Sequence, residues 1–343
     1  MRDVAAVQQE IFRHVLSQLK ATGQNREVLM HILGIGRTAL HARISGKKGL
    51  QLNELLLLLE HFELPRELLY PKSPTLAIDF PFLNHGVRTG ASFLEDLLHQ
   101  VQRVAQLQDA HLYYLSPEIP IFYYFRYPEL SYFKLFVYQR AIWSGSGQKS
   151  QAFSLQCAKA QAWTDTFQQI HEQYLALDST EIWDSDWVKS TLGQLLYYAQ
   201  SGDFAQPREA LTLCDQLEGL LNDLIQAAAN GRKYHRDGRP AGQLRLFYNN
   251  LLRTNNTLLI DSPSQRLLFV TYDDPNYFST QDPQLWQYTR HSFERLQKRS
   301  LPITTHSERD RLRLFKHSHQ HIQSTRQQLL RLNLQPNHTP QGT

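Results

Sequence analysis

Residues 37–48 concentrate side chains that can contact a nucleic acid. A helix over residues 37–45 would place Arg37, Thr38 and His41 on its outer face. Arginine and other polar side chains can hydrogen-bond base edges in the major groove, where each base pair shows its own donors and acceptors. Cations suit phosphate oxygens. Arg43 lies near the end of this helix, and Lys47 and Lys48 follow it. The segment therefore concentrates side-chain types that a nucleic-acid interface uses.

The elements around this segment would position those side chains. Residues 26–33 have the spacing of a short amphipathic helix, with apolar residues at Val28, Leu29, Ile32 and Leu33. Gly34 follows directly and can adopt the left-handed conformation that ends a helix. In the next helix Leu40 and Ile44 would face inward, and Gly46 would end it. Two short helices joined by a glycine-containing turn form a helix-turn-helix, whose second helix lies in the major groove.

Residues 26–69, with the central sequence LGIGRTALHARISGKKGLQLNELLLLLEHFELP, resemble the phage-repressor/Cro-like (XRE-type) helix-turn-helix family of transcriptional regulators. The resemblance implies an all-α, lambda-repressor-like domain over residues 1–70 that reads double-stranded DNA with a recognition helix over residues 37–45. In that family the residues just after the turn read base edges, which here means Arg37, Thr38 and His41. The resemblance likewise implies that basic residues after the helix hold phosphates, here Lys47 and Lys48, and Arg43 near its end is predicted to join them. It also implies sequence-specific transcription regulation by a homodimer. Two residues depart from the pattern of the family: Met30 stands where a small residue is usual, and Arg43 where an apolar residue is common.

Other interpretations stay open beside this one. Any small helical bundle can contain a helix that ends at a glycine and is followed by another helix, and Arg37 would then be a solvated terminal residue. For the whole chain the alternatives are an antitoxin-like or scaffold protein-binding module, and an enzyme that uses the N-terminal domain for DNA targeting. Charge favours DNA, since residues 26–49 contain five Lys or Arg and one Glu.

The formal net charge of +4 is distributed unevenly along the 343 residues. Residues 1–72 carry +3, residues 73–229 carry −8 and residues 230–343 carry +9. A basic start, an acidic middle and a basic end suggest separate surfaces for separate partners. The acidic middle is the feature that favours a protein-binding module. The basic end would contact nucleic acid, an anionic ligand or the acidic middle of the same chain.

Cysteine usage and hydropathy bear on the compartment. Cys157 and Cys214 lie far apart and form no C-x-x-C pair, which argues against a disulfide scaffold or a thiolate metal site. The start of the chain has no apolar core of a signal peptide. The longest apolar run, Leu55 to Leu59, is too short to span a bilayer. A cytoplasmic protein with no membrane partner is the expectation.

The sequence predicts two domains and two connecting or terminal segments. The N-terminal domain is followed by a linker over residues 71–88, a larger mixed α/β, helix-rich domain over residues 89–332 and a disordered tail over residues 333–343. The larger domain would serve dimerisation and effector sensing, and its phrase DSTEIWDSDWVKSTLGQLLYY is similar to bacterial regulators with such a companion domain. Expected strands are residues 111–115, 119–125, 244–248, 257–260 and 266–272. Expected helices are residues 92–107, 128–143, 153–177, 185–200, 208–229, 286–299 and 305–332.

A second cluster of cations lies at residues 231–242, GRKYHRDGRPAG, which read as a loop of low apolar content. Clustered arginines on a loop suit the capture of phosphate or carboxylate. The residues of this candidate anion or ligand loop are Arg232, Lys233, Arg236 and Arg239. A flexible, solvated loop without a ligand is the alternative, and it is favoured by composition.

Patterns of known catalytic and metal sites are missing. The sequence contains no G-x-S-x-G, no G-x-x-x-x-G-K-[ST] and no G-x-G-x-x-G after a strand. His317 and His321 have a metal-competent i, i+4 spacing, but neighbouring cations favour a solvated helix face. Asp273 and Asp274 precede Pro275 and are better explained as a turn. No catalytic residue, metal or cofactor is therefore predicted, and the chain is not expected to be an enzyme.

Overall fold

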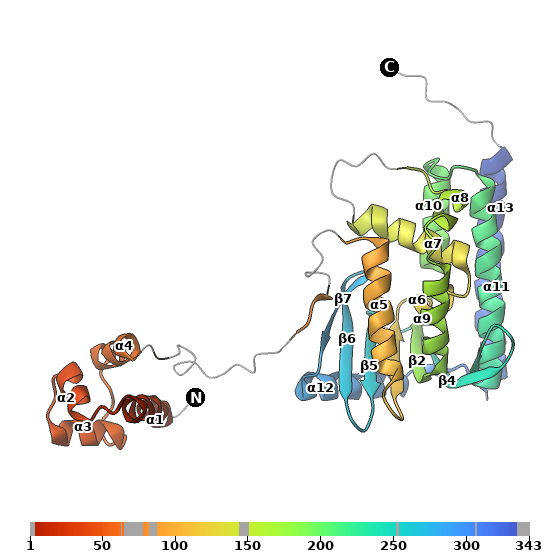
Figure 1. Ribbon diagram of the computed structural model, residues 1–343. Helices are drawn as coiled ribbons and strands as arrows, with labels where there is room; N and C mark the ends of the chain where they lie inside the picture. The colour runs from red at the N-terminus through yellow and green to blue at the C-terminus, as the bar shows by residue number, and fades with distance from the viewer. Residues whose placement is uncertain are drawn as a thin grey trace. The chain divides into compact units, whose positions relative to one another are not determined.

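The chain divides into two compact units, Met1–Leu76 and Ala77–Thr343, called here the N-terminal unit and the companion unit (Figure 1). A computed structural model describes residues 4–62, 64, 78–81, 88–143, 151–251, 254–305 and 307–334. Most of the predicted linker lies outside these described residues. The predicted tail does so too, except for residues 333 and 334, which belong to the last helix.

Four helices of the N-terminal unit share one apolar core. They are α1 (Val4–Thr22), α2 (Glu27–Leu33), α3 (Arg37–Ile44) and α4 (Leu52–His61). Val15 of α1 is buried together with one leucine from each of the other helices: Leu29, Leu40 and Leu58. Apolar side chains at helical spacing produce this arrangement, because each short helix must bury one face to be stable.

The companion unit is built on one mixed sheet of eight strands. Their order is β3-β4-β2-β1-β5-β6-β7, and β8 pairs with β4. The neighbours β4, β2 and β1 run parallel, whereas β1 and β5, β5 and β6, and β6 and β7 are antiparallel. The strands are β1 (His111–Ser116), β2 (Asp178–Asp184), β3 (Arg232–Tyr234), β4 (Pro240–Asn249), β5 (Thr257–Asp261), β6 (Arg266–Asp273), β7 (Asn276–Thr280) and β8 (Leu301–Pro302).

Most helices of the companion unit pack into one large core, and α12 packs into a smaller one. The smaller core joins Ile182, Leu259 and Leu268 of the sheet to Trp286 and Phe293 of α12. Figure 1 shows α5 and α9 side by side, and they are in contact. The helices are α5 (Gly90–Ala105), α6 (Ile121–Tyr124), α7 (Pro128–Tyr138) with a π-helical turn (Gln139–Trp143), α8 (Leu155–Lys159), α9 (Thr164–Ala176), α10 (Lys189–Gln200), α11 (Arg208–Asn230), α12 (Pro283–Gln297) and α13 (Glu308–Leu334).

The prediction of a mixed α/β, helix-rich fold is confirmed for the companion unit, with several local corrections. Residues 119–125 are wrong as a strand: Pro120 precedes the short helix α6, whose residues Phe122, Tyr123 and Tyr124 are all buried. Continuous apolarity there reflects burial on every side. The predicted helix 153–177 is two helices, α8 and α9. The β2 strand was not predicted at all, because its first residues, Asp178 to Thr180, are polar residue types that are common in loops.

None of the helices in the described ranges combines the length and the apolar character that a bilayer crossing requires. The longest, α13, has 27 residues and places its buried apolar side chains on one stripe, whereas Leu312 and Leu330 are exposed. Phe315, Ile322 and Leu329 of that stripe follow one another at intervals of seven residues and are buried. The length of α13 therefore serves packing, chiefly against α11 and α10.

Candidate nucleic-acid interface

A tight turn between α2 and α3 fixes the start of α3. The Asn25 side chain, one residue before the N-cap residue Arg26, accepts a hydrogen bond from the Glu27 backbone N–H at 2.9 Å. At the other end of α2, Gly34 adopts a left-handed φ of 62°, and the Ile35 N–H bonds to the Met30 carbonyl at 3.1 Å. Gly36 is extended and precedes the first residue of α3. Only three residues, Gly34 to Gly36, therefore connect α2 to α3.

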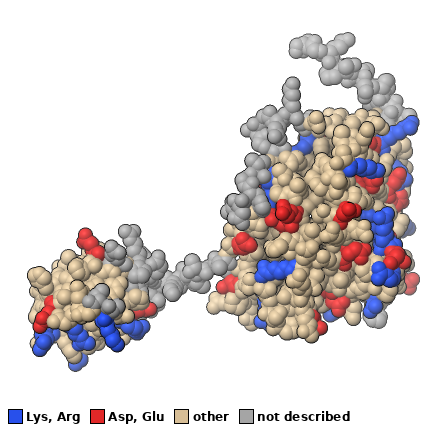
Figure 2. Space-filling model, in the orientation of Figure 1, with Lys and Arg blue, Asp and Glu red and all other residues tan. Residues whose placement is uncertain are grey.

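The N-terminal half of α3 presents an exposed polar face. Arg37, Thr38 and His41 are all exposed, whereas Leu40 between them is buried. Within the described residues, none of the three exposed side chains takes part in a hydrogen bond or an ion pair. Figure 2 shows Lys and Arg side chains gathered along the lower side of the N-terminal unit, where Figure 1 shows α3. The three side chains are free to bind a ligand while their helix is held by the core.

Lys47 and Lys48 are exposed on the segment between α3 and α4. A buried glutamine of α1, Gln8, holds the backbone of this segment. Its Nε2 donates to the carbonyl oxygens of Arg43 at 2.6 Å and Lys48 at 2.8 Å, and its Oε1 accepts from the Leu50 N–H at 2.8 Å. The two lysines therefore stand on a fixed backbone although their side chains are in water.

Arg43 does not belong with these lysines, and its prediction as a phosphate contact is wrong. The side chain is buried, and its Nε donates to both carboxylate oxygens of Glu54 at 2.9 and 2.8 Å. Glu54 is itself buried and accepts the Gln51 N–H at 2.9 Å, in a capping box at the start of α4. Arg43 therefore joins α3 to α4 from inside the unit and cannot reach a phosphate.

The same ion pair makes the N-terminal unit sensitive to acid. Hydrogen bonds from Arg43 hold the pKa of Glu54 below its usual value. Glu54 therefore contributes stability above its ordinary pKa of about 4.3, and this contribution is lost as the pH falls through the lower, folded-state pKa. We expect the NMR amide signals of α3 and α4 to disappear in an acid titration before those of the companion unit. Glu54→Gln, which cannot titrate, should lack this acid step, and an identical acid profile for both proteins would contradict the assignment.

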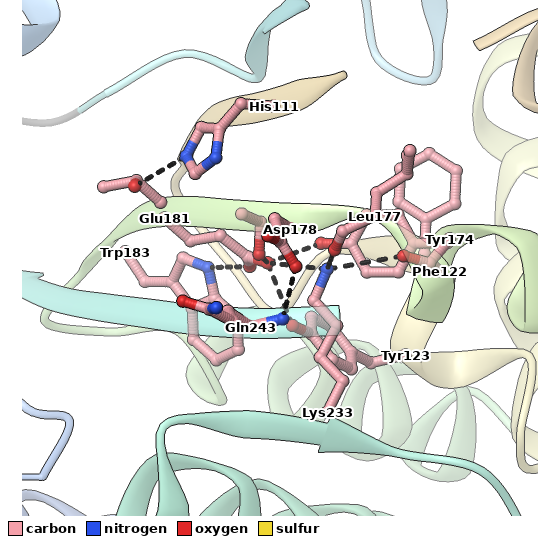
Figure 3. A network of polar contacts seen from close by, with 12 residues as sticks. His111, Phe122, Tyr123, Tyr174, Leu177, Asp178, Glu181, Trp183, Lys233 and Gln243 are labelled. Carbon is pink, nitrogen blue, oxygen red and sulfur yellow. Dashed lines mark hydrogen bonds and ion pairs between the residues drawn. The ribbon is translucent and has the colours of Figure 1, made fainter. Parts of the chain in front are cut away.

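The predicted anion loop at residues 231–242 is a hairpin formed by β3 and the start of β4, not a solvated loop. Lys233 is buried, so its prediction as an anion-binding residue is wrong. Its Nζ donates to the carbonyl oxygens of Leu177 at 2.8 Å and Tyr174 at 3.3 Å, at the end of α9 (Figure 3). A cation at that end satisfies carbonyl groups that the helix leaves unpaired. Burial lowers the pKa of Lys233 to about 8, and the carboxylate of Glu181 opposes the shift.

Three arginines of this hairpin are exposed, but they do not form one cluster of free charges. Arg239 is paired with Asp237 at 2.6 Å, and His235 is paired with Glu172. Arg232 and Arg236 remain exposed without an ion pair among the described residues. Arg236 lines a cavity of about 80 Å³. A second arginine of that lining, Arg126, forms an ion pair with Asp223 at 2.9 Å. The hairpin therefore offers two free cations where the sequence suggested four.

The remaining chemical candidates give no catalytic or metal constellation in the part of the chain that the structure describes. His317 and His321 lie with their ring centroids 4.3 Å apart on α13. No third His, Cys, Asp or Glu completes a metal site with them among the described residues. Asp274 and Pro275 form the turn between β6 and β7, as predicted. The exposed face of α3 is thus the candidate site that the geometry favours.

Sequence reasoning missed the two residues that hold this site, Gln8 and Glu54. Each is a polar residue on an otherwise amphipathic helix, so each resembles an ordinary surface position. One signal was present: Arg43 interrupts an apolar position, and a buried arginine requires an acidic partner. Glu54, three residues after Gln51, the N-cap residue of α4, is a partner of the required kind. Its partnership with Arg43 depends on the fold and not on sequence spacing.

Comparison with known proteins adds no functional information. No protein-family model, curated protein or solved structure matches the chain. A proposal about function therefore depends on the geometry of the described residues.

Proposed function

We propose that the N-terminal unit binds double-stranded DNA with α3 in the major groove, where Arg37, Thr38 and His41 contact base edges. The observation that carries the proposal is the exposed face of α3. Its three polar side chains have no hydrogen bond or ion pair with other described residues, and they stand directly after a tight turn on a helix fixed by a buried core. A helix in this position is how a helix-turn-helix reads a sequence.

Lys47 and Lys48 would contact phosphates beside the groove. They follow the reading helix by only a few residues, and Gln8 fixes their backbone. Phosphate contacts determine the position and the register of a protein on DNA and add affinity that depends on salt. Arg43 has no part in this set, because Glu54 already engages it inside the unit.

The whole chain would act as a sequence-specific transcription regulator, without enzymatic activity or a cofactor. Proteins that read DNA through such a unit commonly bind as twofold dimers to half-sites about one helical turn, ~34 Å, apart. The companion unit is large enough to supply the dimer contact and to respond to an effector. A signal would then act by changing the population of dimers whose α3 helices match the half-site spacing.

The proposal is tested by selection of duplexes from a random library with the full chain, followed by fluorescence anisotropy in a salt series. The selected duplex should bind at least ~10³-fold tighter than a scrambled duplex, as specific readers do. The variant Arg37→Ala, Thr38→Ala, His41→Ala should lose this preference. Lys47→Ala with Lys48→Ala should instead weaken both complexes alike and reduce the salt slope by about 2.

Two results would contradict the proposal. One is equal, weak binding of the selected and scrambled duplexes. The other is a triple variant that retains the full preference of the wild-type chain, which would show that α3 does not read the bases. In either case an antitoxin-like or scaffold protein-binding module becomes the better interpretation.

A further inference from the structure

A cavity of about 110 Å³ lies inside the companion unit, between α5 and the sheet. Leu97, Val101 and Val104 of α5 form one wall, and Leu258 of β5 and Phe269 of β6 form the opposite wall. Most of the remaining lining is also apolar or aromatic. An apolar cavity of about 150 Å³ is enough to admit benzene. This cavity is smaller, at about 110 Å³, so it is suited to an organic molecule of at most about six non-hydrogen atoms, with part of that molecule in the opening.

One end of the cavity is polar and carries acidic groups. Glu118 and Asp274 both line it, together with Asn256 and the buried Tyr114. Glu118 is neutralised by Lys134, whose Nζ lies 3.1 Å from a Glu118 carboxylate oxygen. Asp274 has no cationic partner within ion-pair distance among the described residues. It also has an exposed surface, so it stands where the cavity opens to solvent.

The environment of Asp274 shows that its charge is not compensated. Two effects raise the pKa of Asp274 to about 6. The larger is the partial loss of water around its carboxylate, and the second is the negative charge of nearby Glu118. Lys134 and the Asn256 side chain oppose this shift but do not cancel it. A carboxylate in such a position is stabilised when a cation comes within a few ångströms of it. At pH 7.5 the group is mainly ionised and attracts a cation at the mouth.

Further hydrogen-bonding capacity is unused in the wall. The Oε1 of Gln100 and the hydroxyl of Tyr277 are both buried, and neither has a hydrogen-bond partner among the described residues. Buried polar atoms of this kind are normally satisfied, and an unsatisfied one costs free energy. Gln100 Oε1 can only accept, so it also favours a ligand with N–H or O–H donors.

We propose that this cavity binds a small alkyl or aryl amine, with its apolar part between α5 and the sheet and its ammonium group at Asp274. The lining is apolar where the carbon skeleton would lie, and the carboxylate of Asp274, which has no cationic partner among the described residues, stands at the mouth. This inference concerns the companion unit alone and goes beyond the proposed DNA binding. It stands or fails whether or not the N-terminal unit reads DNA.

The test uses the full chain and three probes with closely related carbon skeletons: isopentylamine, 3-methylbutanol and 3-methylbutanoate. Thermal unfolding is followed by tryptophan fluorescence, which reports the companion unit because all five tryptophans lie there. Binding to the folded state stabilises it by RT ln(1 + [L]/Kd), so the midpoint rises with the logarithm of ligand concentration once that concentration exceeds Kd. The amine should bind at least ~10-fold tighter than the alcohol, and the acid should not bind measurably.

Two variants and one control separate this site from non-specific binding. Asp274→Asn should weaken binding of the amine about 10-fold and leave the alcohol unaffected, since only the amine uses the charge. Asp273→Asn, which removes the neighbouring carboxylate outside the cavity, should leave both affinities unchanged. Val101→Phe should fill the cavity and abolish binding of both probes, and Leu97→Phe replaces it if that variant does not fold.

The proposal is overturned if the three probes raise the midpoint equally. It is also overturned if Asp274→Asn and Asp273→Asn have the same effect, or if a folded variant with a filled cavity still binds the amine. None of these outcomes depends on DNA. Failure here and failure of the proposed DNA reading are therefore distinguishable.

Discussion

Replacing Glu54 by alanine is expected to unfold the N-terminal unit and to leave the companion unit folded. The change leaves the buried guanidinium of Arg43 without its carboxylate and removes the acceptor for the Gln51 N–H. Removing one partner of a buried ion pair costs about 3–5 kcal/mol. A module of this size rarely has more than about 3–5 kcal/mol of stability from its core. The loss would therefore be comparable with the whole stability of the unit.

Hydrogen exchange by mass spectrometry measures this effect on the full chain. Peptides from α3 and α4 should lose their protection in Glu54→Ala, while the tryptophan fluorescence of the companion unit stays that of the wild type. Glu60→Ala is the matched control, because Glu60 lies on the same helix and is exposed. A surface change of this kind should alter stability by no more than about 0.5 kcal/mol.

A double variant distinguishes the loss of the ion pair from a loss of packing. Arg43→Met with Glu54→Leu removes both charges and fills the space with apolar atoms, and such replacements are often neutral or stabilising. It should restore protection in α3. It should also keep specific DNA binding, because Arg43 is buried against Glu54 and is not among the residues proposed to contact DNA. If Glu54→Ala alone keeps full protection, the ion pair is not what joins α3 to α4.

Local patterns in the sequence predicted a large part of the fold. The helices of the N-terminal unit follow from apolar spacing and from Gly34, since both act within a few neighbouring residues. The hairpin of β5 and β6 follows in the same way from two apolar runs around a turn-forming tetrapeptide, Asp261 to Ser264. Exposure of Arg37 and His41 is also a consequence of helical periodicity. These features depend on short-range geometry and need no tertiary contact.

Features that depend on distant partners could not be predicted. The local sequence around Lys233 is typical of a surface lysine. Its burial depends on the carbonyl oxygens of Tyr174 and Leu177 at the end of α9, which are distant in the sequence. In β2, Ser179 and Glu181 are polar residues of a central strand that no predicted helix or strand covers. Each is acceptable inside the protein only because its hydrogen bonds are made there. The stability of such groups is decided by contacts that no local pattern contains.

Glu181 is the buried residue of the companion unit whose replacement should have the largest effect. Its Oε1 accepts hydrogen bonds from the hydroxyls of Ser179 at 2.7 Å, Tyr174 at 2.8 Å and Tyr123 at 3.0 Å (Figure 3). Its Oε2 accepts the indole N–H of Trp183 at 3.0 Å. One side chain thus satisfies donors from β2, α6 and α9 in the centre of the unit.

Glu181→Ala is expected to destabilise the companion unit by more than about 4 kcal/mol. The change leaves four buried donors without an acceptor and also deprives Lys233 of its nearest carboxylate, 3.9 Å away. Each unsatisfied buried group costs about 1–3 kcal/mol, and breaking a buried hydrogen-bond network is one of the few causes of losses above about 4–5 kcal/mol. The buried positive charge of Lys233 would add to the penalty.

Urea denaturation followed by tryptophan fluorescence tests this expectation. Glu181→Gln separates the loss of the acceptor for Trp183 from the loss of the acceptor for the three hydroxyls. The amide keeps one oxygen for the three hydroxyls but turns its N–H₂ group toward the N–H of Trp183, so that two donors face each other. The free energy of unfolding of Glu181→Gln should therefore lie between those of the wild type and Glu181→Ala. Asp186→Ala, which breaks an exposed pair with Lys189, should change stability by no more than about 1 kcal/mol. If Glu181→Ala were as mild as Asp186→Ala, water would have to replace the carboxylate, and this network would not be what holds β2 to α6 and α9.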